Sequence, residues 1–495
     1  MDDHRSIKKQ AISSTIWKFL ERFIAQGVSF VVSLIIARIL IPDDYSVVSI
    51  VTIFFAFANV LISGGLNTAL IQKKNADELD YSTIFHISVF IAVLVYIILF
   101  FLAPVIANIY HKSDLVSVIR VMGLILPVTA IKSIYSAYIS SHLQFKKFFF
   151  ATLGGTIVSA FVGIWMALTG FGPWALVAQQ MTNTAIDTVI LVICTHVGIT
   201  MKISMERFRS LFRYSWKILV SNLLGTVYSE VSPLAIGLKF SATDLAFYTK
   251  GKSFPTLLST TTTNTLASVL FPVMAKFQDE KDKILKYTRL YIRLSSFITF
   301  PFMLGLFGVS RSFVLTVLTE KWLPSVYYIK IFCLCNMFDI TSAGNCETIK
   351  AIGRSDVYLK MEIVKKVGYF LTLAVFLVFS KSPEILAVAT CVCVLIQIVV
   401  NSIPNITLIG YKLKYQLEDL LPNLFSAGLM CAAILLVEKL SLAPLITLII
   451  QILVGIMIYF AIAVFTKNSS LLYIFQTVKN MTRRDQQLHE TIDQN

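Results

Sequence analysis

Charged residues are scarce in this chain. Asp, Glu, Lys and Arg make up 14% of its 495 residues, whereas soluble proteins contain about 25%. Apolar residues make up 56%, and because a bilayer-spanning helix needs about 20 residues, this suffices for roughly 13 or 14 spans. The composition excludes a soluble enzyme and a receptor with a single membrane anchor. It also excludes a membrane β-barrel, whose strands alternate apolar and polar residues instead of forming long apolar runs.

The seven cysteines do not form a metal-binding pattern. All lie within apolar stretches, and the two C-x-C pairs, Cys333/Cys335 and Cys391/Cys393, have no nearby histidine or acid to complete a ligand set. Cysteine in such surroundings behaves as a small apolar side chain. We therefore expect neither a metal nor another cofactor. The connections between apolar runs are also short, so we expect no separate extramembrane domain and no enzyme activity.

Membrane topology explains the net charge of +15. Lys and Arg concentrate in the loops on one side of the apolar runs, as they do in cytoplasmic loops of membrane proteins. Because the number of runs is even, both termini are predicted to be cytoplasmic, and no nucleic-acid partner is needed to account for the charge. The predicted spans are residues 14–40, 45–70, 82–109, 115–140, 149–170, 173–197, 213–238, 253–275, 288–312, 325–349, 357–380, 383–408, 421–438 and 442–466.

The sequence contains an internal repeat with a period of six helices. Trp17-Lys18 near the start of the first span matches Trp216-Lys217 near the start of the seventh. An even period gives both halves the same orientation, as in transporters whose two lobes are related by a pseudo-twofold axis along the membrane normal. We therefore predict an all-α integral membrane protein with about 14 transmembrane helices. Its predicted parts are an N-terminal lobe (1–197), a C-terminal lobe (198–412), two extra helices (413–466) and a cytoplasmic tail (467–495).

Polar and charged residues within the predicted spans are candidates for substrate binding. A charge in the bilayer costs about 2.5–3.5 kcal/mol on insertion scales, so it usually faces protein or water. In the first and seventh spans such residues recur every three or four positions and share one helical face. The alternatives are snorkelling of the cations to headgroups and hydroxyl bonding within the same helix. The candidates are Lys18, Arg22, Gln26, Lys132, Lys217, Ser221, Tyr228, Thr261 and Asn264.

Three acidic residues lie deep within predicted spans: Asp187, Glu230 and Asp339. Burial disfavours the charged form of a carboxylate, so such a group can carry a proton, or it can hold sodium together with neighbouring oxygens. These residues are therefore candidates for coupling transport to a proton or sodium gradient. The alternative is an ion pair or hydrogen bond with a Lys or Arg on a neighbouring helix.

Four stretches resemble the polysaccharide exporters of the multidrug/oligosaccharidyl-lipid/polysaccharide flippase superfamily. Leu168 to Gln180 contains GFG, W, ALV and QQ in the family's order, and Ala37 to Tyr45 is similar to its ARLLGPEDYG segment. The other two are Phe212 to Leu219 with the residues after it, and Leu270-Phe271-Pro272-Val273 with Pro301 downstream. The resemblance points to the branch that contains Wzx-type O-antigen or capsule flippases and teichuronic acid exporters.

This resemblance implies a transporter in the bacterial cytoplasmic (inner) membrane. Its substrate would be an undecaprenyl-diphosphate-linked oligosaccharide, moved to the external leaflet by alternating access for synthesis of O-antigen lipopolysaccharide, capsule or exopolysaccharide. Lys18, Arg22 and Lys217 would capture the diphosphate, while polar stripes solvate the sugars. Membrane lipid surrounds such a protein, and a polysaccharide polymerase and a chain-length regulator are candidate partners. The chain has Ile41 and Ser46 where the family has glycine, so its first outer turn must be built differently.

Two other functions are considered. A multidrug/cation antiporter of the same superfamily would need an acidic or apolar cavity, which the Lys and Arg residues argue against. A membrane glycosyltransferase or polymerase acting on polyprenyl-linked sugars would need catalytic acids outside the membrane, for which Asp43 and Asp44 are candidates. Asp244 at the matching position of the repeat favours helix capping for these acids instead.

Overall fold

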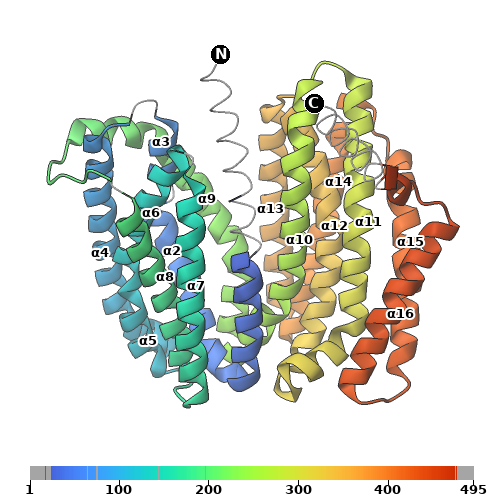
Figure 1. Cartoon of the computed structure of the whole chain (residues 1–495), viewed down its shortest axis with the longest axis horizontal. Helices are drawn as coiled ribbons and strands as arrows, with labels where there is room; N and C mark the ends of the chain where they lie inside the picture. The colour runs from blue at the N-terminus through green and yellow to red at the C-terminus, as the bar shows by residue number, and fades with distance from the viewer. Residues whose placement is uncertain are drawn as a thin grey trace, which may run out of the picture. The chain divides into compact units, whose positions relative to one another are not determined.

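The computed structural model consists of helices, turns and loops. It describes Trp17 and residues 24–63, 65–73, 76–142, 144–195, 197–473 and 475–476, and no strand occurs among them. The chain divides into two compact units, Met1–Ala246 and Phe247–Asn495. The main helices, labelled in Figure 1 where space allows, are Ile24–Ile39, α2 (Pro42–Ser63), α3 (Leu66–Gln72), α4 (Glu78–Ile109), α5 (Asp114–Gly123), α6 (Ile125–Ser141), α7 (Phe145–Leu168), α8 (Trp174–Cys194), α9 (Met205–Lys239), α10 (Ala242–Lys276), α11 (Lys281–Phe313), α12 (Ser325–Ala351), α13 (Ser355–Phe379), α14 (Pro383–Ile409), α15 (Leu413–Glu438) and α16 (Pro444–Phe465).

Nine helical segments of the described chain are long and apolar enough to cross a membrane. Four more helices, α9, α10, α12 and α13, have at least 25 residues each but are less apolar. A 25-residue helix is about 38 Å long, which exceeds the hydrocarbon thickness of about 30 Å. Polar residues on such helices are expected to face protein or water. The predicted fold class, an all-α membrane protein with about 14 long helices, is confirmed.

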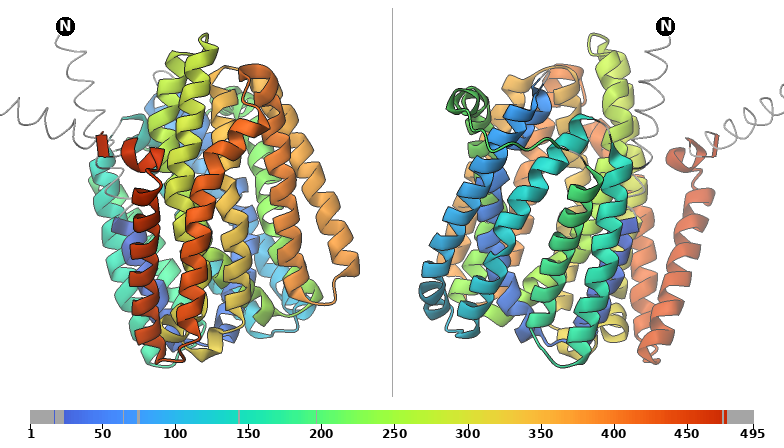
Figure 2. Two further views of the ribbon diagram at one scale, coloured as in Figure 1. Left: turned by 90° about the vertical axis from the view of Figure 1, so that its right-hand side faces the viewer. Right: turned by 60° about the vertical axis from the view of Figure 1, so that its left-hand side comes forward.

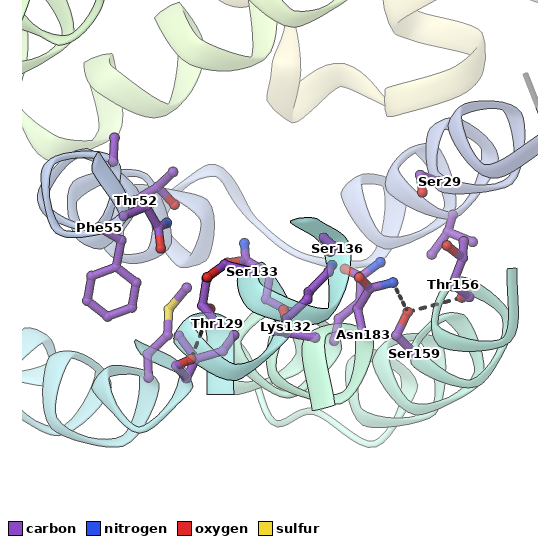
Figure 3. Close-up of a pocket in the computed structure, with 18 residues that line it drawn as sticks. Ser29, Thr52, Phe55, Thr129, Lys132, Ser133, Ser136, Thr156, Ser159 and Asn183 are labelled. Carbon is purple, nitrogen blue, oxygen red and sulfur yellow. Dashed lines mark hydrogen bonds between the residues drawn. The ribbon is translucent and has the colours of Figure 1, made fainter. Parts of the chain in front are cut away.

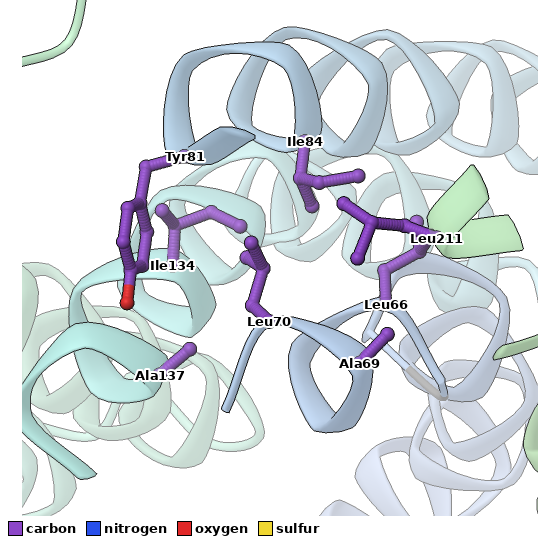
Figure 4. Packing of buried hydrophobic residues seen from close by; sticks show 8 residues of the cluster. All are labelled: Leu66, Ala69, Leu70, Tyr81, Ile84, Ile134, Ala137 and Leu211. Carbon is purple, nitrogen blue, oxygen red and sulfur yellow. The ribbon is translucent and has the colours of Figure 1, made fainter. Parts of the chain in front are cut away.

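In the first unit, α7 packs along α8, and α9 packs against α2, α3 and α4. Gly65, just before α3, allows this approach, because a Cβ there would lie 2.4 Å from the carbonyl oxygen of Ser215 on α9. Apolar side chains from α3, α4, α6 and α9 close the contact in one cluster (Figure 4). Its buried members are Leu66, Ala69, Leu70, Tyr81, Ile84, Ile134, Ala137 and Leu211.

An ionic cluster fixes the start of α4 beside α9. Asp77 caps α4, with its carboxylate accepting the backbone N–H of Asp80 at 2.9 Å. This hydrogen bond holds the pKa of Asp77 below its usual value. The Asp80 carboxylate is fully buried and binds Lys73 at 2.5 Å and Arg207 of α9 at 3.3 Å. The buried acid therefore joins the turn after α3 to the first turn of α9.

In the second unit, α11 packs against α12, α15 and α16, and α14 packs against α12 and α13 (Figure 2). Polar groups join α12 to α14: the Asn405 side-chain amide donates to Asn345 Oδ1 at 2.8 Å. A disulfide between Cys335 and Cys391 links the same two helices. This pairing corrects the expectation that the cysteines serve only as apolar packing. The C-x-C spacing did not predict this disulfide, because the bond joins one cysteine from each C-x-C pair.

Candidate substrate-binding site

The first unit contains a cavity of about 680 Å³. Its wall comes from the Ile24–Ile39 helix and from α2, α5, α6, α7 and α8, and Figure 3 shows the lining side chains. Most of the lining residues carry hydroxyl or amide groups, and among the described residues the lining has one cation and no carboxylate. We call it the sugar cavity, after the ligand that we propose for it. Its polar lining residues are Ser29, Thr52, Asn59, Thr129, Lys132, Ser133, Ser136, Thr156, Ser159, Gln179, Gln180, Asn183 and Thr184.

Helical spacing brings these polar groups to one side of each helix. On α8, Gln179 and Asn183 are four residues apart, as are Gln180 and Thr184, so all four share a face. The two glutamines are the QQ of the motif noted in the sequence. Thr129, Lys132, Ser133 and Ser136 form a similar face on α6. Sequence reasoning selected only Lys132 from this wall, although the same three- and four-residue spacing of hydroxyls and amides was a usable signal.

Hydrogen bonds and close packing hold α7 and α8 together at the cavity. The Asn183 amide donates to Ser159 Oγ at 3.3 Å, and Ser159 donates to the Thr156 carbonyl at 3.0 Å (Figure 3). Gly155 allows the helices to approach, since a Cβ there would lie 2.8 Å from the Asn183 carbonyl oxygen. The amide and hydroxyl groups of this wall are therefore positioned by the backbone contact of two helices.

Lys132 connects the cavity to a buried acid. Its Nζ lies 2.5 Å from Oδ2 of Asp187 on α8, and the Asp187 side chain is only 2% exposed. Asp187 does not line the cavity, whereas Lys132 does. The cationic member of this ion pair is therefore the one that faces the cavity.

A smaller cavity of about 390 Å³ lies between α2 and α9 in the same unit. Asn59 and Ser63 of α2 face Ser221 and Gly225 of α9 across it. Asn59 also lines the sugar cavity, so the two cavities share one wall residue. The polar stripe predicted on the seventh span thus contributes to a polar cavity through Ser221.

The remaining predicted binding residues lie elsewhere. Gln26 and Lys217 are exposed and Tyr228 is half-buried, and none of them lines either cavity. On α10, Thr261 and Asn264 are exposed, and the Thr261 hydroxyl donates to the Leu257 carbonyl at 2.8 Å. The predicted residues Lys18 and Arg22 lie outside the described part of the chain.

The three deep acids have different surroundings. Asp187 is paired with Lys132, and Glu230 on α9 accepts a hydrogen bond from Ser229 at 3.1 Å. Asp339 on α12 is within electrostatic reach of Lys252 and Lys365 but forms no salt bridge with a described residue. The predicted ion-coupling role of these acids stays a prediction. Among the described residues, no group of three or more His, Cys, Asp or Glu is placed to hold a metal ion.

The acids considered for catalysis have structural contacts at helix starts. Asp44 accepts the backbone N–H of Ile41 at 3.1 Å, and Asp244 bonds to Ser241 at the corresponding position before α10. Asp43 pairs with Lys112 and accepts the Thr243 hydroxyl. The contacts of Asp44 and Asp244 are those of helix capping, at equivalent positions of two helices, whereas Asp43 is held by an ion pair with the turn between α4 and α5.

Glycines shape the turn between α7 and α8, where the family motif lies. Gly170 and Gly172 have φ values of +82° and +55°, which side chains with a Cβ rarely adopt. Trp174 then begins α8. The GFG segment therefore forms the reversal that aligns α8 with α7, and the QQ pair follows on the cavity face.

The second unit has an apolar cavity of about 470 Å³. Phe297, Pro301 and Phe302 of α11 line it with Met430 of α15 and Tyr459 of α16. The Tyr459 hydroxyl donates to the Phe297 carbonyl at 2.7 Å, which turns its polar atom toward the backbone. This cavity is suited to a hydrocarbon chain.

Comparison with known proteins agrees with these features. The chain is 22% identical over 435 residues to the teichuronic acid biosynthesis protein TuaB of Bacillus subtilis (strain 168), covering 86% of this chain and 88% of that protein. It is 23% identical over 376 residues to the lipopolysaccharide biosynthesis protein WzxC of Escherichia coli (strain K12), covering 73% of this chain and 74% of that protein.

Two solved structures share the fold. The lipid II flippase MurJ in an inward closed conformation has a TM-score of 0.73 at 13% identity, covering 92% of this chain and 99% of that one. An inward-facing multidrug resistance MATE family transporter has a TM-score of 0.60 at 12% identity, covering 80% of this chain and 98% of that one.

Residues 35–327 match the family described as polysaccharide biosynthesis protein. The resemblance to polysaccharide exporters is confirmed, and the chain belongs to the polysaccharide biosynthesis protein family.

Proposed function

We propose that this protein is a flippase that moves a lipid-linked oligosaccharide across the bacterial cytoplasmic membrane for synthesis of a surface polysaccharide. The sugar cavity carries the proposal. The cavity has a volume of about 680 Å³ and is lined by hydroxyls and amides. Burying such polar groups in an apolar helix bundle costs free energy unless they form hydrogen bonds with a partner. Sugar hydroxyls donate and accept hydrogen bonds and are suitable partners for such a wall.

The other parts of the substrate have candidate sites as well. The apolar cavity between α11, α15 and α16 can accept a stretch of polyprenyl chain. A diphosphate needs cations, and the candidates remain Lys18, Arg22 and Lys217 on the predicted cytoplasmic side. Charge-assisted bonds between Lys or Arg and phosphate are strong enough to persist in a partly hydrated site. Alternating access of two lobes, with both termini in the cytoplasm, completes the proposed mechanism.

The structure favours this function over the other two. A cation antiporter would present carboxylates to its substrate, whereas the sugar cavity presents Lys132 and keeps Asp187 behind it. A glycosyltransferase would need free acids at the membrane surface, whereas Asp43 is ion-paired with Lys112 and Asp44 accepts the backbone N–H of Ile41.

A flipping assay tests the proposal. The purified chain is reconstituted into liposomes that contain a fluorescent undecaprenyl-diphosphate oligosaccharide, and a membrane-impermeant quencher reports the label that reaches the outer leaflet. We expect fast, protein-dependent loss of the protected fluorescence. A fluorescent phosphatidylcholine in parallel liposomes is the control. Equal movement of both lipids, or movement of neither, would refute the proposed function.

A further inference from the structure

A third polar cavity, of about 440 Å³, lies in the second unit between α11 and the segment that follows α16. It is far in sequence from the sugar cavity and shares no residue with it. Three cations on successive turns of α11 line one side: Lys286, Arg289 and Arg293. Ser469 and Ser470 line the other side. We call it the basic cavity.

A buried carboxylate fixes the two arginines. Arg289 binds Asp419 of α15 with Nε and NH2, both at 2.9 Å, and Arg293 Nε lies 2.5 Å from Asp419 Oδ1. The Asp419 side chain is 0% exposed and does not line the cavity. The Tyr411 hydroxyl donates to its other oxygen at 3.0 Å. A guanidinium held from behind in this way keeps a fixed orientation, which is the preorganisation that a binding site needs.

The arginines keep donors for a ligand. Guanidinium has five N–H donors, and the hydrogen bond of Arg293 to Asp419 uses only Nε. Among the described residues, the cavity wall holds three cations and one carboxylate, that of Asp282. Glu418, which contacts Arg289 at 3.4 Å, is 46% exposed and lies outside the lining. The wall therefore turns the cations and their unused N–H groups toward the cavity, while Asp419 and Glu418 lie outside the lining.

The opposite wall is also fixed in place. The Asn468 amide donates to Asn423 Oδ1 on α15 at 2.8 Å, and the Ser470 hydroxyl donates to the Arg293 carbonyl at 3.2 Å. These bonds hold the segment after α16 against α11 and α15, which run side by side with α16 in Figure 2. The cavity thus has two walls from parts of the chain about 180 residues apart, and both are anchored by buried polar contacts.

We propose that the basic cavity binds the phosphate group of an anionic membrane lipid. Arginine forks match the geometry of phosphate oxygens, and serine hydroxyls supply further donors. The cations lie in the first four turns of α11, beside basic loops that are predicted to be cytoplasmic. Basic pockets between helices at this surface are suited to lipid headgroups. The basic cavity shares no lining residue with the sugar cavity or the apolar cavity, so this proposal does not depend on the flippase function.

Mass spectrometry of the intact protein released from lipid nanodiscs tests the proposal. The full chain is compared in nanodiscs of phosphatidylcholine alone and with one-fifth phosphatidylglycerol. We expect one retained phosphatidylglycerol in the unchanged protein and about a tenfold lower occupancy after K286Q with R293Q, since two charge-assisted bonds are lost. Arg289 is left intact so that Asp419 keeps a partner. The control is K281Q with K360Q, which removes two exposed cations outside the cavity.

The readouts separate the sources of phosphate. Thermal unfolding in phosphatidylcholine nanodiscs with inorganic phosphate shows whether a free anion stabilises the protein as phosphatidylglycerol does. Stabilisation by inorganic phosphate alone would overturn the lipid assignment. Equal loss of bound lipid in both double variants would show that general surface charge, and not the basic cavity, retains the lipid. That result would also overturn the proposal. Should the cavity variant not fold, K286Q alone changes an exposed side chain and is expected to lower occupancy several-fold; unchanged occupancy would refute the proposal.

Discussion

Lys132 on α6 and Asp187 on α8 form an ion pair at the wall of the sugar cavity, with 2.5 Å between Nζ and Oδ2. The second oxygen of Asp187, Oδ1, is buried and has no hydrogen-bond partner among the described residues. The positive charge of Lys132 therefore offsets the free-energy cost of burying the Asp187 carboxylate. Lys132 also lines the cavity. The same side chain therefore stabilises the wall through its ion pair and places a cation at the cavity surface.

Replacing Lys132 with Gln is expected to destabilise the protein by about 3–5 kcal/mol, because it leaves a buried carboxylate without its partner. The double variant K132Q with D187N removes both charges and is expected to recover most of that loss. Unfolding in detergent, followed by circular dichroism, measures both. If the double variant is no more stable than K132Q, the ion pair does not have the role described here.

Gly155 and Gly154 on α7 form a matched pair. A Cβ on Gly155 would lie 2.8 Å from the Asn183 carbonyl oxygen and 3.2 Å from the Asp187 amide, both backbone atoms of α8. G155A is therefore expected to separate the helices and cost about 1–3 kcal/mol. A Cβ on Gly154 would meet only the flexible end of Ile190, so G154A is expected to be neutral or stabilising by up to about 1 kcal/mol. Thermal unfolding of both variants checks this; the reverse order would contradict the α7–α8 packing.

The amides of the sugar cavity are expected to matter for transport. Q180L with N183L replaces two amide side chains on one face of α8 with apolar ones. Loss of hydrogen bonds of this kind is expected to reduce flipping about tenfold, measured in the liposome assay at matched protein amounts. T372V is the control, since the Thr372 hydroxyl donates to the Gly368 carbonyl of its own helix and lies outside all three polar cavities. Full flipping by the α8 variant would remove this wall from the pathway.

The proposed diphosphate-binding cations can be tested together. Replacing Lys18, Arg22 and Lys217 with Ala is expected to abolish surface polysaccharide export in cells, because the anionic headgroup loses its partners at the proposed cytoplasmic entrance. Protein level is measured by immunoblot of the membrane fraction. Normal export at a normal protein level would show that the diphosphate is recognised elsewhere.

The cap of α4 predicts a pH dependence. The pKa of Asp77 in the folded protein is lowered, chiefly by the backbone N–H of Asp80, relative to about 3.9 in an unfolded chain. Its ionised form therefore stabilises the fold above that pH, and the contribution is lost as the pH falls through the lower, folded-state pKa. D77N caps comparably but does not titrate. We expect the difference in unfolding midpoint between the two proteins to be constant near neutral pH and to shrink below about pH 4; a difference independent of pH would contradict this.

The sequence by itself determined the fold class, the approximate helices and the family. Hydropathy and charge asymmetry are properties of each segment alone, so composition was enough to define an all-α membrane protein. Helix capping was also local: the match of Asp44 with Asp244 predicted equivalent helix starts, and both acids make contacts of this kind.

Only the tertiary structure decided which polar faces meet. Lys132 and Asp187 were each selected from the sequence, one for binding and one for ion coupling, but their pairing depends on how α6 packs against α8. The same holds for Asn183 and Ser159, and for the disulfide between Cys335 and Cys391. The periodicity of one helix shows that a face is polar, but it does not identify the helix across from it. That depends on close backbone contacts such as the one at Gly155, whose steric cost appears only when two helices are placed together.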